Sequence, residues 1–432
     1  MAGDNRLTPA ILRWSRRPLE RMATILIITA SYPYLPGEQF LEREIDCWSN
    51  SGHDVIIFPA VAAGRPRPIP PNIAVNLDLA KFRTRSRKAA YLARAIWTRL
   101  FVNEARYLLS VRNLKLRTLY QAARFIAQAL LTEQALERIV EKIGRADLVY
   151  TYWNDTEAIG AALVKRRSLV SRVVSRAHGF DVVEERRPHQ YMPVKRQFAH
   201  DFDTIFTNSQ YVKTYLVRQY DFSPDTTVVS RLGVPLPTAV APPSPVNEFR
   251  VASVSFCVRV KRIDKIVHAI RAAALAKPEI AFAWTHIGGG PLLEELTALA
   301  AAELGALPNV TVVFTGTLPN ELIVAALTEQ PCDLFVHASE SEGLGVALME
   351  AMSAGIPVLA PAVGGVPELV DADRGYLMQP NPSALEIGQS LVAIMDIAKS
   401  AEVRQNARRF VERACDAEVL YRAFVAECTS AL

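Results

Sequence analysis

The chain has few cysteines and no long apolar run. Its five cysteines include no close pair of the Cys-x-x-Cys kind (Cys47, Cys257, Cys332, Cys415 and Cys428). An odd, scattered set favours reduced thiols in a cytosolic protein over a disulfide framework or a zinc site. No apolar run reaches the roughly 18 residues that a membrane-spanning helix requires. The arginines near the N-terminus precede only a strand-length apolar segment, so we expect no signal peptide and a cytoplasmic location.

Motifs for two common ligands are also missing. No Gly-x-Gly-x-x-Gly follows the first strand-like run, Thr24–Ala30, so dinucleotide binding finds no support. Two Asp-x-Asp strings occur, at Asp201–Asp203 and at Asp371–Asp373. The first precedes a strand pattern and the second lies in a turn, and neither is a typical setting for a divalent ion. We therefore expect no metal site.

Basic residues are concentrated in one stretch, although the net charge of the 432 residues is only +5. Twelve basic residues lie between Lys81 and Arg124, against one acid, Glu104. Apolar and aromatic residues interleave with them at helical spacing (Tyr91, Ile96, Trp97, Leu100, Phe101, Tyr107 and Leu108). Such basic amphipathic helices suit an anionic membrane surface. Two alternatives remain open: a solvated helical face packed on a sheet, and nucleic-acid binding, for which no signature accompanies the charge.

Short apolar runs alternate with helical patterns along the whole chain, which predicts an α/β fold with parallel sheets. A proline-rich stretch at 237–245 reads as a linker, because it is stiff and has no packing residues. We therefore predict a first domain over residues 1–237, with a basic helical insertion at about 79–145. A second domain follows over 248–410, and a C-terminal helix over 411–432.

The most informative stretch is Ser339–Ala360. A buried-strand pattern ends at His337, a loop carries Glu342 and Gly343, and a helix pattern runs from Val346 to Ser353. Helix N-termini have unpaired N–H groups and a partial positive charge, so this turn suits a phosphate. Glu342 and Glu350 lie up to about 12 Å apart at helical rise. One carboxylate can therefore reach each side of a bound diphosphate.

These residues, with Gly355-Ile-Pro357 and Gly364-Gly365 after them, resemble the family-4 retaining glycosyltransferases. The resemblance implies the GT-B fold, in which two Rossmann-like domains face a cleft and the last helix crosses back to the first domain. It implies that Glu342 holds hydroxyls of the donor sugar and that Glu350 holds the ribose. The loops around the nucleotide-sugar would include Gly289, Gly290, Gly343, Leu344, Gly345 and Val346. The string Arg176–Arg186 is similar to a subset that builds bacterial exopolysaccharide, capsule or lipopolysaccharide.

The same resemblance assigns cations, a histidine and an acceptor side. His178 ends a strand pattern and would point at the donor sugar, whereas Lys261 would neutralise the diphosphate. The family arginine is replaced by Phe256 and a family glycine by Arg262, so Arg259 is the candidate for the missing guanidinium. The loop after the first strand would face the acceptor, with Tyr32, Gly37 and Glu38 as candidates.

The function expected from this reading is the metal-independent, retaining transfer of a hexose from a nucleotide-diphosphate sugar to a sugar hydroxyl. The acceptor would be a lipid-linked oligosaccharide at the cytoplasmic membrane face, with no cofactor and no nucleic-acid partner. A nucleotide-sugar epimerase on the same architecture is one alternative. A non-catalytic sugar-nucleotide-binding partner of a polysaccharide assembly complex is another, since Phe256 departs from the family pattern.

Overall fold

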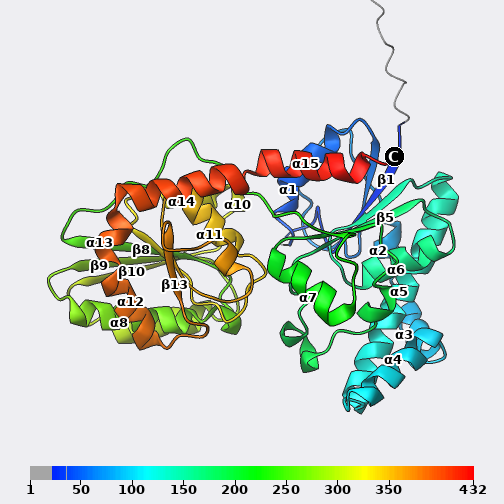
Figure 1. The fold of residues 1–432 in the computed structure, drawn as a ribbon, viewed down its shortest axis with the longest axis horizontal. Coiled ribbons are helices and arrows are strands. Elements are labelled where there is room, and N and C mark those ends of the chain that lie inside the picture. The colour runs from blue at the N-terminus through cyan, green and yellow to red at the C-terminus, as the bar shows by residue number, and fades with distance from the viewer. Residues whose placement is uncertain (1–21, 36) are drawn as a thin grey trace, which may run out of the picture.

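A computed structural model describes residues 22–35 and 37–432. Two α/β domains lie side by side, and the last helix reaches from the second domain onto the first (Figure 1). The segment relevant to a signal peptide, residues 1–21, lies outside the described residues. The predicted architecture of two parallel Rossmann-like sheets is confirmed.

The first domain is built on a seven-stranded sheet in the order β3-β2-β1-β4-β5-β6-β7. All its pairings are parallel, and its central strands are almost fully buried, as their continuous apolar sequences predict. The two-residue strand Ala74–Val75 follows a stretch that contains Pro66, Pro68, Pro70 and Pro71, and its Ala74 pairs with Ile56. So short a strand has no readable alternation. The strands are β1 Thr24–Thr29, β2 Asp54–Pro59, β3 Ala74–Val75, β4 Leu148–Thr151, β5 Arg172–Ala177, β6 Thr204–Thr207 and β7 Thr227–Val229.

Helices cover both faces of this sheet, and the basic stretch forms four of them. The long helix α5 packs along α6, with Gly160 at the contact. A Cβ at Gly160 would lie 2.5 Å from the Cβ of Thr132, so only glycine lets the helices approach this closely. The helices are α1 Leu41–Ser49, α2 Asp78–Phe82, α3 Arg85–Ala95, α4 Arg99–Ser110, α5 Leu116–Ile143, α6 Thr156–Arg166 and α7 Gln210–Tyr220, with 3₁₀ turns at Glu184–Arg186, Pro188–Gln190 and Lys195–Phe198.

The second domain repeats the plan with a six-stranded parallel sheet in the order β10-β9-β8-β11-β12-β13. The strands are β8 Glu248–Val254, β9 Ala281–Ile287, β10 Val310–Gly316, β11 Leu334–Val336, β12 Val358–Pro361 and β13 Gly375–Met378. The helices are α8 Ile263–Ala276, α9 Leu293–Leu304, α10 Asn320–Thr328, α11 Val346–Ser353, α12 Ala384–Ala393, α13 Met395–Lys399 and α14 Ala401–Ala414, with 3₁₀ turns at Arg259–Lys261 and Val366–Glu368.

The chain returns to the first domain through α15, Ala417–Thr429, after a bend at Cys415–Asp416. Phe424 inserts between strands and helix, with its ring 6.1 Å from that of Trp48 and 4.9 Å from that of Phe206. The bend is tied to the end of the first domain, because Val234 N–H donates to the Cys415 carbonyl at 2.9 Å. The predicted return of the last helix is therefore confirmed.

The basic helices α3 and α4 lie at one end of the first domain (Figure 1). The apolar residues in and beside these helices do not share one face: Tyr91 and Leu108 are buried, while Trp97, between α3 and α4, and Leu116, at the start of α5, are each 86% exposed. Glu104 is buried and accepts a 2.6 Å hydrogen bond from the Tyr191 hydroxyl. The exposed surface of this stretch therefore combines arginines and lysines with isolated apolar side chains.

The cysteines and the acids of the two Asp-x-Asp strings can now be placed in the structure. All five cysteines are free, and all but Cys47 are buried. Asp201 pairs with Arg166 at 2.6 Å, Asp203 with Lys165 at 2.7 Å, and Asp371 with Arg374 at 2.7 Å. Among the residues that the structure describes, no helix is long and apolar enough to cross a bilayer.

Candidate active site

A cleft of about 380 Å³ lies between the domains, where the carboxyl ends of the two sheets face each other. Parallel α/β sheets bind ligands at this edge because loops from several strands converge there. The first domain contributes residues that follow β4, β5 and β6, and the second contributes residues that follow β8, β9 and β11. The lining includes the sequence-predicted residues His178, Lys261, Gly289, Gly343, Leu344, Gly345, Val346, Glu342 and Glu350.

Glu342 is a buried carboxylate held by two basic side chains. Its Oε1 forms an ion pair with Lys261 Nζ and lies 2.9 Å from His337 Nε2. Burial alone would favour the neutral acid, but the charge of Lys261 and the contact with His337 hold the pKa of Glu342 well below its usual range. Glu342 is therefore an ionised hydrogen-bond acceptor at neutral pH. His337 was not among the site residues predicted from the sequence, although a histidine at the carboxyl end of a predicted strand is a typical position for a ligand-binding residue.

The N-terminus of α11 opens directly onto the cleft. Its N-cap is Gly345 at φ +96°, which no side chain caps, and its first turn has no acidic residue. The loop before it is packed tightly, because a Cβ at Gly364 would lie 1.8 Å from the Glu342 carbonyl oxygen. The free N–H groups of α11 thus form a preorganised anion site.

Glu350 lies one turn farther along α11 and has a different environment. It is 4% exposed, and burial raises its pKa from 4.5 to about 7. No cation accounts for any part of this shift. The two glutamates in the cleft therefore differ in charge: Glu342 is anionic at neutral pH, whereas Glu350 is partly protonated.

His178 lies on the first-domain side of the cleft. Its ring contacts those of Tyr152 and Trp153, with centroids 4.7 and 4.5 Å away. The Asp181 carboxylate accepts N–H bonds from His178 at 2.8 Å and Gly179 at 3.0 Å, which sets the loop. Within the described residues, both ring nitrogens of His178 are buried without a hydrogen-bond partner. Nδ1 lies 3.7 Å from the Asp181 carboxylate, so Nε2 is the ring nitrogen available to a ligand in the cleft.

The cations are arranged differently from the prediction. Lys261 lines the cleft, as does Phe256, which is 57% exposed. Arg259 does not line it and instead borders a separate hollow with Arg262 and Glu340. Arg262 adopts φ +50° at the start of α8, a left-handed conformation that favours glycine, the residue that the family resemblance implies at this position. Gly290 also lies outside the cleft, packed against the Cys257 backbone.

An arginine that the sequence analysis did not select, Arg186, occupies the cleft wall. It belongs to the first domain, yet its Nη2 donates to the carbonyl of Ser341 in the second domain at 3.2 Å. Its Nη1 lies beside Gly179, where a Cβ would approach within 2.8 Å. A guanidinium therefore lies next to the Glu342–Gly343 loop. The spacing of residues in the sequence gave no motif that would have identified it.

The predicted acceptor-side residues shape their loop and do not line the cleft. Tyr32 is buried, and Glu38 accepts backbone N–H bonds from Ala30, Ser31 and Tyr32 at 2.6–2.9 Å. Glu38 also accepts from Trp153 Nε1 at 2.7 Å, which positions the ring beside His178. Gly37 binds Arg67 through its carbonyl. The neighbouring residues Gln39 and Phe40 line the cleft instead.

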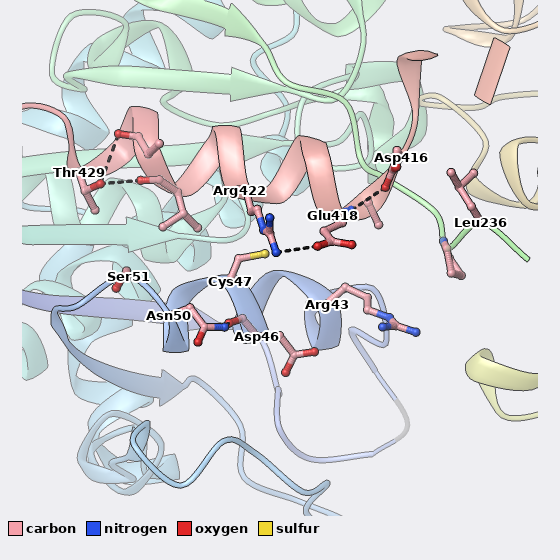
Figure 2. A pocket seen from close by; sticks show the side chains of 14 residues that line it. Arg43, Asp46, Cys47, Asn50, Ser51, Leu236, Asp416, Glu418, Arg422 and Thr429 are labelled. Atoms are coloured by element: carbon pink, nitrogen blue, oxygen red, sulfur yellow. Dashed lines mark hydrogen bonds and ion pairs between the residues drawn. The ribbon is translucent and has the colours of Figure 1, made fainter. Parts of the chain in front are cut away.

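A larger hollow, about 850 Å³, lies along α1 and α15 on another part of the surface. Arg43 and Asp46 of α1 face Glu418 and Arg422 of α15, and the last two form an ion pair at 2.6 Å (Figure 2). No glycine loop lines it, and the α15 N-terminus that borders it is capped by Asp416 and has Glu418 in its first turn, whereas the α11 N-terminus at the cleft is uncapped. The interdomain cleft is therefore the better candidate for chemistry.

Part of the chain matches a known protein family. Residues 240–410 match the family of glycosyl transferases group 1. The chain is 27% identical over 288 residues to WcaL of Escherichia coli (strain K12), named as a colanic acid biosynthesis glycosyltransferase, covering 64% of this chain and 69% of WcaL. It is 28% identical over 274 residues to a GDP-mannose-dependent phosphatidylinositol monomannoside mannosyltransferase of Mycolicibacterium smegmatis, covering 59% and 69% of the two chains.

Solved structures share the whole fold. Anabaena HepE, crystallised with UDP and glucose, aligns with a TM-score of 0.63 at 18% identity, over 94% of this chain and 99% of HepE. The lipopolysaccharide outer core galactosyltransferase WaaB aligns with a TM-score of 0.64 at 15% identity, over 95% and 100%. Residues 240–410 therefore match the group 1 glycosyl transferases in sequence, and the whole chain shares the GT-B fold of these structures.

Proposed function

We propose that this protein is a retaining glycosyltransferase that moves a hexose from a nucleotide-diphosphate sugar to a hydroxyl of a glycan acceptor. The observation that carries the proposal is the cleft itself, where an uncapped helix N-terminus, Lys261 and an ionised Glu342 converge. This combination suits a donor that has both an anionic leaving group and sugar hydroxyls. The UDP and glucose found with HepE support the same donor class.

Stabilisation of the leaving diphosphate is the main electrostatic task. Lys261, Arg186 and the N–H groups of α11 would surround the phosphates as negative charge develops on them. Glu342 would accept hydrogen bonds from sugar hydroxyls, and His178 would bind the sugar from the opposite wall. Glu350 would hold the ribose. The acceptor would attack from the face that the diphosphate leaves, with a phosphate oxygen taking its proton, so we propose catalysis without a metal or another cofactor.

We also propose that the enzyme works peripherally at the cytoplasmic face of a membrane, on a lipid-linked oligosaccharide for surface polysaccharide synthesis. The exposed Trp97 and Leu116 beside the basic helices support this location. The names of WcaL and WaaB, which refer to colanic acid and to lipopolysaccharide outer core, favour an acceptor of this kind.

The first prediction tests the central assignment. Glu342→Gln should bind the donor but turn it over about 100-fold more slowly, because an ionised acceptor for the sugar is lost. Donor hydrolysis can be followed with a panel of UDP-, GDP- and ADP-hexoses, after a thermal-shift screen has identified the one that binds. The control is Glu340→Gln, an exposed acid nearby that pairs with Arg262. Equal turnover by the two variants would disprove the assignment. Donor binding without any hydrolysis or transfer by the wild-type protein would favour a non-catalytic role.

The second prediction separates the two candidate arginines. Arg186→Lys should lower kcat/KM for the donor about tenfold or more, because lysine cannot reproduce the two parallel N–H bonds of a guanidinium. Arg259→Lys should change it less than about twofold, since Arg259 borders a different hollow. The reverse ranking in steady-state kinetics would return the missing-guanidinium role to Arg259.

The third prediction follows from the environment of Glu350. A folded-state pKa of about 7, raised from 4.5, means that ionisation opposes folding. The stability that the protonated carboxyl provides is fully present below about pH 4.5 and is lost as the pH rises through about 7. Relative to Glu350→Gln, the wild type should lose about 3 kcal/mol across this interval, as urea unfolding at several pH values can measure. A stability difference that does not change with pH would contradict the burial of this group.

The fourth prediction concerns the membrane. The protein should co-sediment with anionic phosphatidylglycerol vesicles and not with neutral phosphatidylcholine vesicles, and the binding should weaken with salt. Trp97→Ala combined with Leu116→Ala should reduce it. Leu385→Ala, an exposed leucine of the second domain, is the matched control. Binding to both vesicle types alike, or to neither, would reject the proposal.

A further inference from the structure

Another hollow, of about 570 Å³, opens beside the cleft on the first domain. We call it the arginine hollow, after Arg83, Arg117, Arg124 and Arg187, which line it. Ala30 and Ala60 at the carboxyl ends of β1 and β2 form its floor. Phe180 lines both this hollow and the cleft, so the two spaces adjoin each other.

One wall of the arginine hollow is a single face of α5. Arg117, Tyr120, Gln121, Arg124 and Gln128 recur at the three- and four-residue spacing that places side chains on one side of a helix. Both Arg117 and Arg124 are exposed, and neither forms an ion pair with the described residues. This wall therefore presents two uncompensated positive charges.

The opposite wall is neutralised internally. Arg83 pairs with Glu157 at 2.5 Å, and Arg187 pairs with Asp155 at 2.8 Å while its guanidinium stacks over the Phe180 ring at 4.8 Å. The Nε atoms of Arg83 and Arg187 are buried, and within the described chain neither has a hydrogen-bond partner. The helix α6 also begins here, with Thr156 and Glu157 in the lining.

Four arginines against two carboxylates leave the arginine hollow positive. A site of this size and charge suits an anion larger than a single carboxylate. Guanidinium groups bind phosphate oxygens through paired N–H bonds.

We propose that the arginine hollow binds the phosphate or diphosphate group of the acceptor, so that the accepting sugar reaches past Phe180 into the cleft. This assignment rests on the proposed function, because it requires a glycan acceptor. The ligand class is a glycosyl diphosphate, either linked to a lipid or free in solution. No covalent change occurs at the hollow, which binds and orients the acceptor.

A neighbouring groove indicates which source would bind better. It shares Tyr120, Arg124 and Gln128 with the arginine hollow and continues between α3 and α5. Its floor is apolar, with Leu92, Ala127 and Leu131. A lipid chain attached to the diphosphate would find apolar contacts there, whereas a free glycosyl phosphate would not use them.

Isothermal titration with inorganic pyrophosphate tests the site. The titration is made with Lys261→Gln protein, so that the donor cleft lacks its ammonium group and competes weakly. Adding Arg117→Gln and Arg124→Gln should weaken pyrophosphate binding by about tenfold or more, since each charge-assisted contact is worth at least about a factor of ten. The matched control adds Arg99→Gln and Arg106→Gln, two exposed arginines of α4 outside the hollow, which remove the same charge. The control should bind within about twofold of its parent.

Equal weakening in both variants, or no pyrophosphate binding by the Lys261→Gln protein, would overturn the proposal. A second titration with farnesyl diphosphate separates the sources: tighter binding than pyrophosphate supports a lipid-linked acceptor, and equal binding supports a free glycosyl phosphate. Donor hydrolysis is measured in parallel on Arg117→Gln/Arg124→Gln protein with Lys261 intact. It should stay at the wild-type rate, because these residues do not line the cleft. Absence of hydrolysis in the wild type would count against the proposed function alone, since pyrophosphate binding is read independently.

Discussion

The close approach of two backbone segments from different domains shapes this molecule. A Cβ at Gly343 would lie 2.0 Å from the carbonyl oxygen of His178, so only glycine allows the two loops to meet. That contact brings the carboxyl ends of two separate parallel sheets onto one cleft. Each sheet then supplies what the other lacks: the second domain offers an anion site, and the first offers a histidine and an arginine from across the gap.

The second domain also contacts the first at two helices, α7 and α15. Glu368 accepts N–H bonds from Gln210 and Tyr211 at 3.0 and 2.9 Å, which satisfies the start of α7. On the other side, α15 packs its Phe424 into the first domain. The domains are thus joined both through Glu368 and through α15, which limits how far they can separate without exposing buried groups.

Charge within the cleft is divided between two glutamates on the same short segment. Lys261 and His337 keep Glu342 ionised, whereas Glu350 has no cation and its pKa is raised by burial. Glu342 is therefore suited to accept hydrogen bonds, whereas Glu350 can carry a proton at neutral pH. Such divergence between neighbouring carboxyl groups is typical of sites where burial and charge pairing are used to separate functions.

Local patterns were sufficient for the elements and for the second-domain half of the cleft. The helix Val346–Ser353 has the bounds that its sequence predicts, and both Glu342 and Glu350 reach the cleft, because one strand–loop–helix unit carries its own periodicity and glycine signals. Lys261, on the turn between β8 and α8, also reaches the cleft. Arg186 and the arginine hollow followed from the packed structure alone. Their partners are far away in sequence, as Arg186 and Ser341 illustrate, and Arg259, near Lys261 in the chain, turns to another hollow. Sequence spacing specifies which residues share a helix face or a loop, but contacts between distant segments depend on how two complete sheets are brought together.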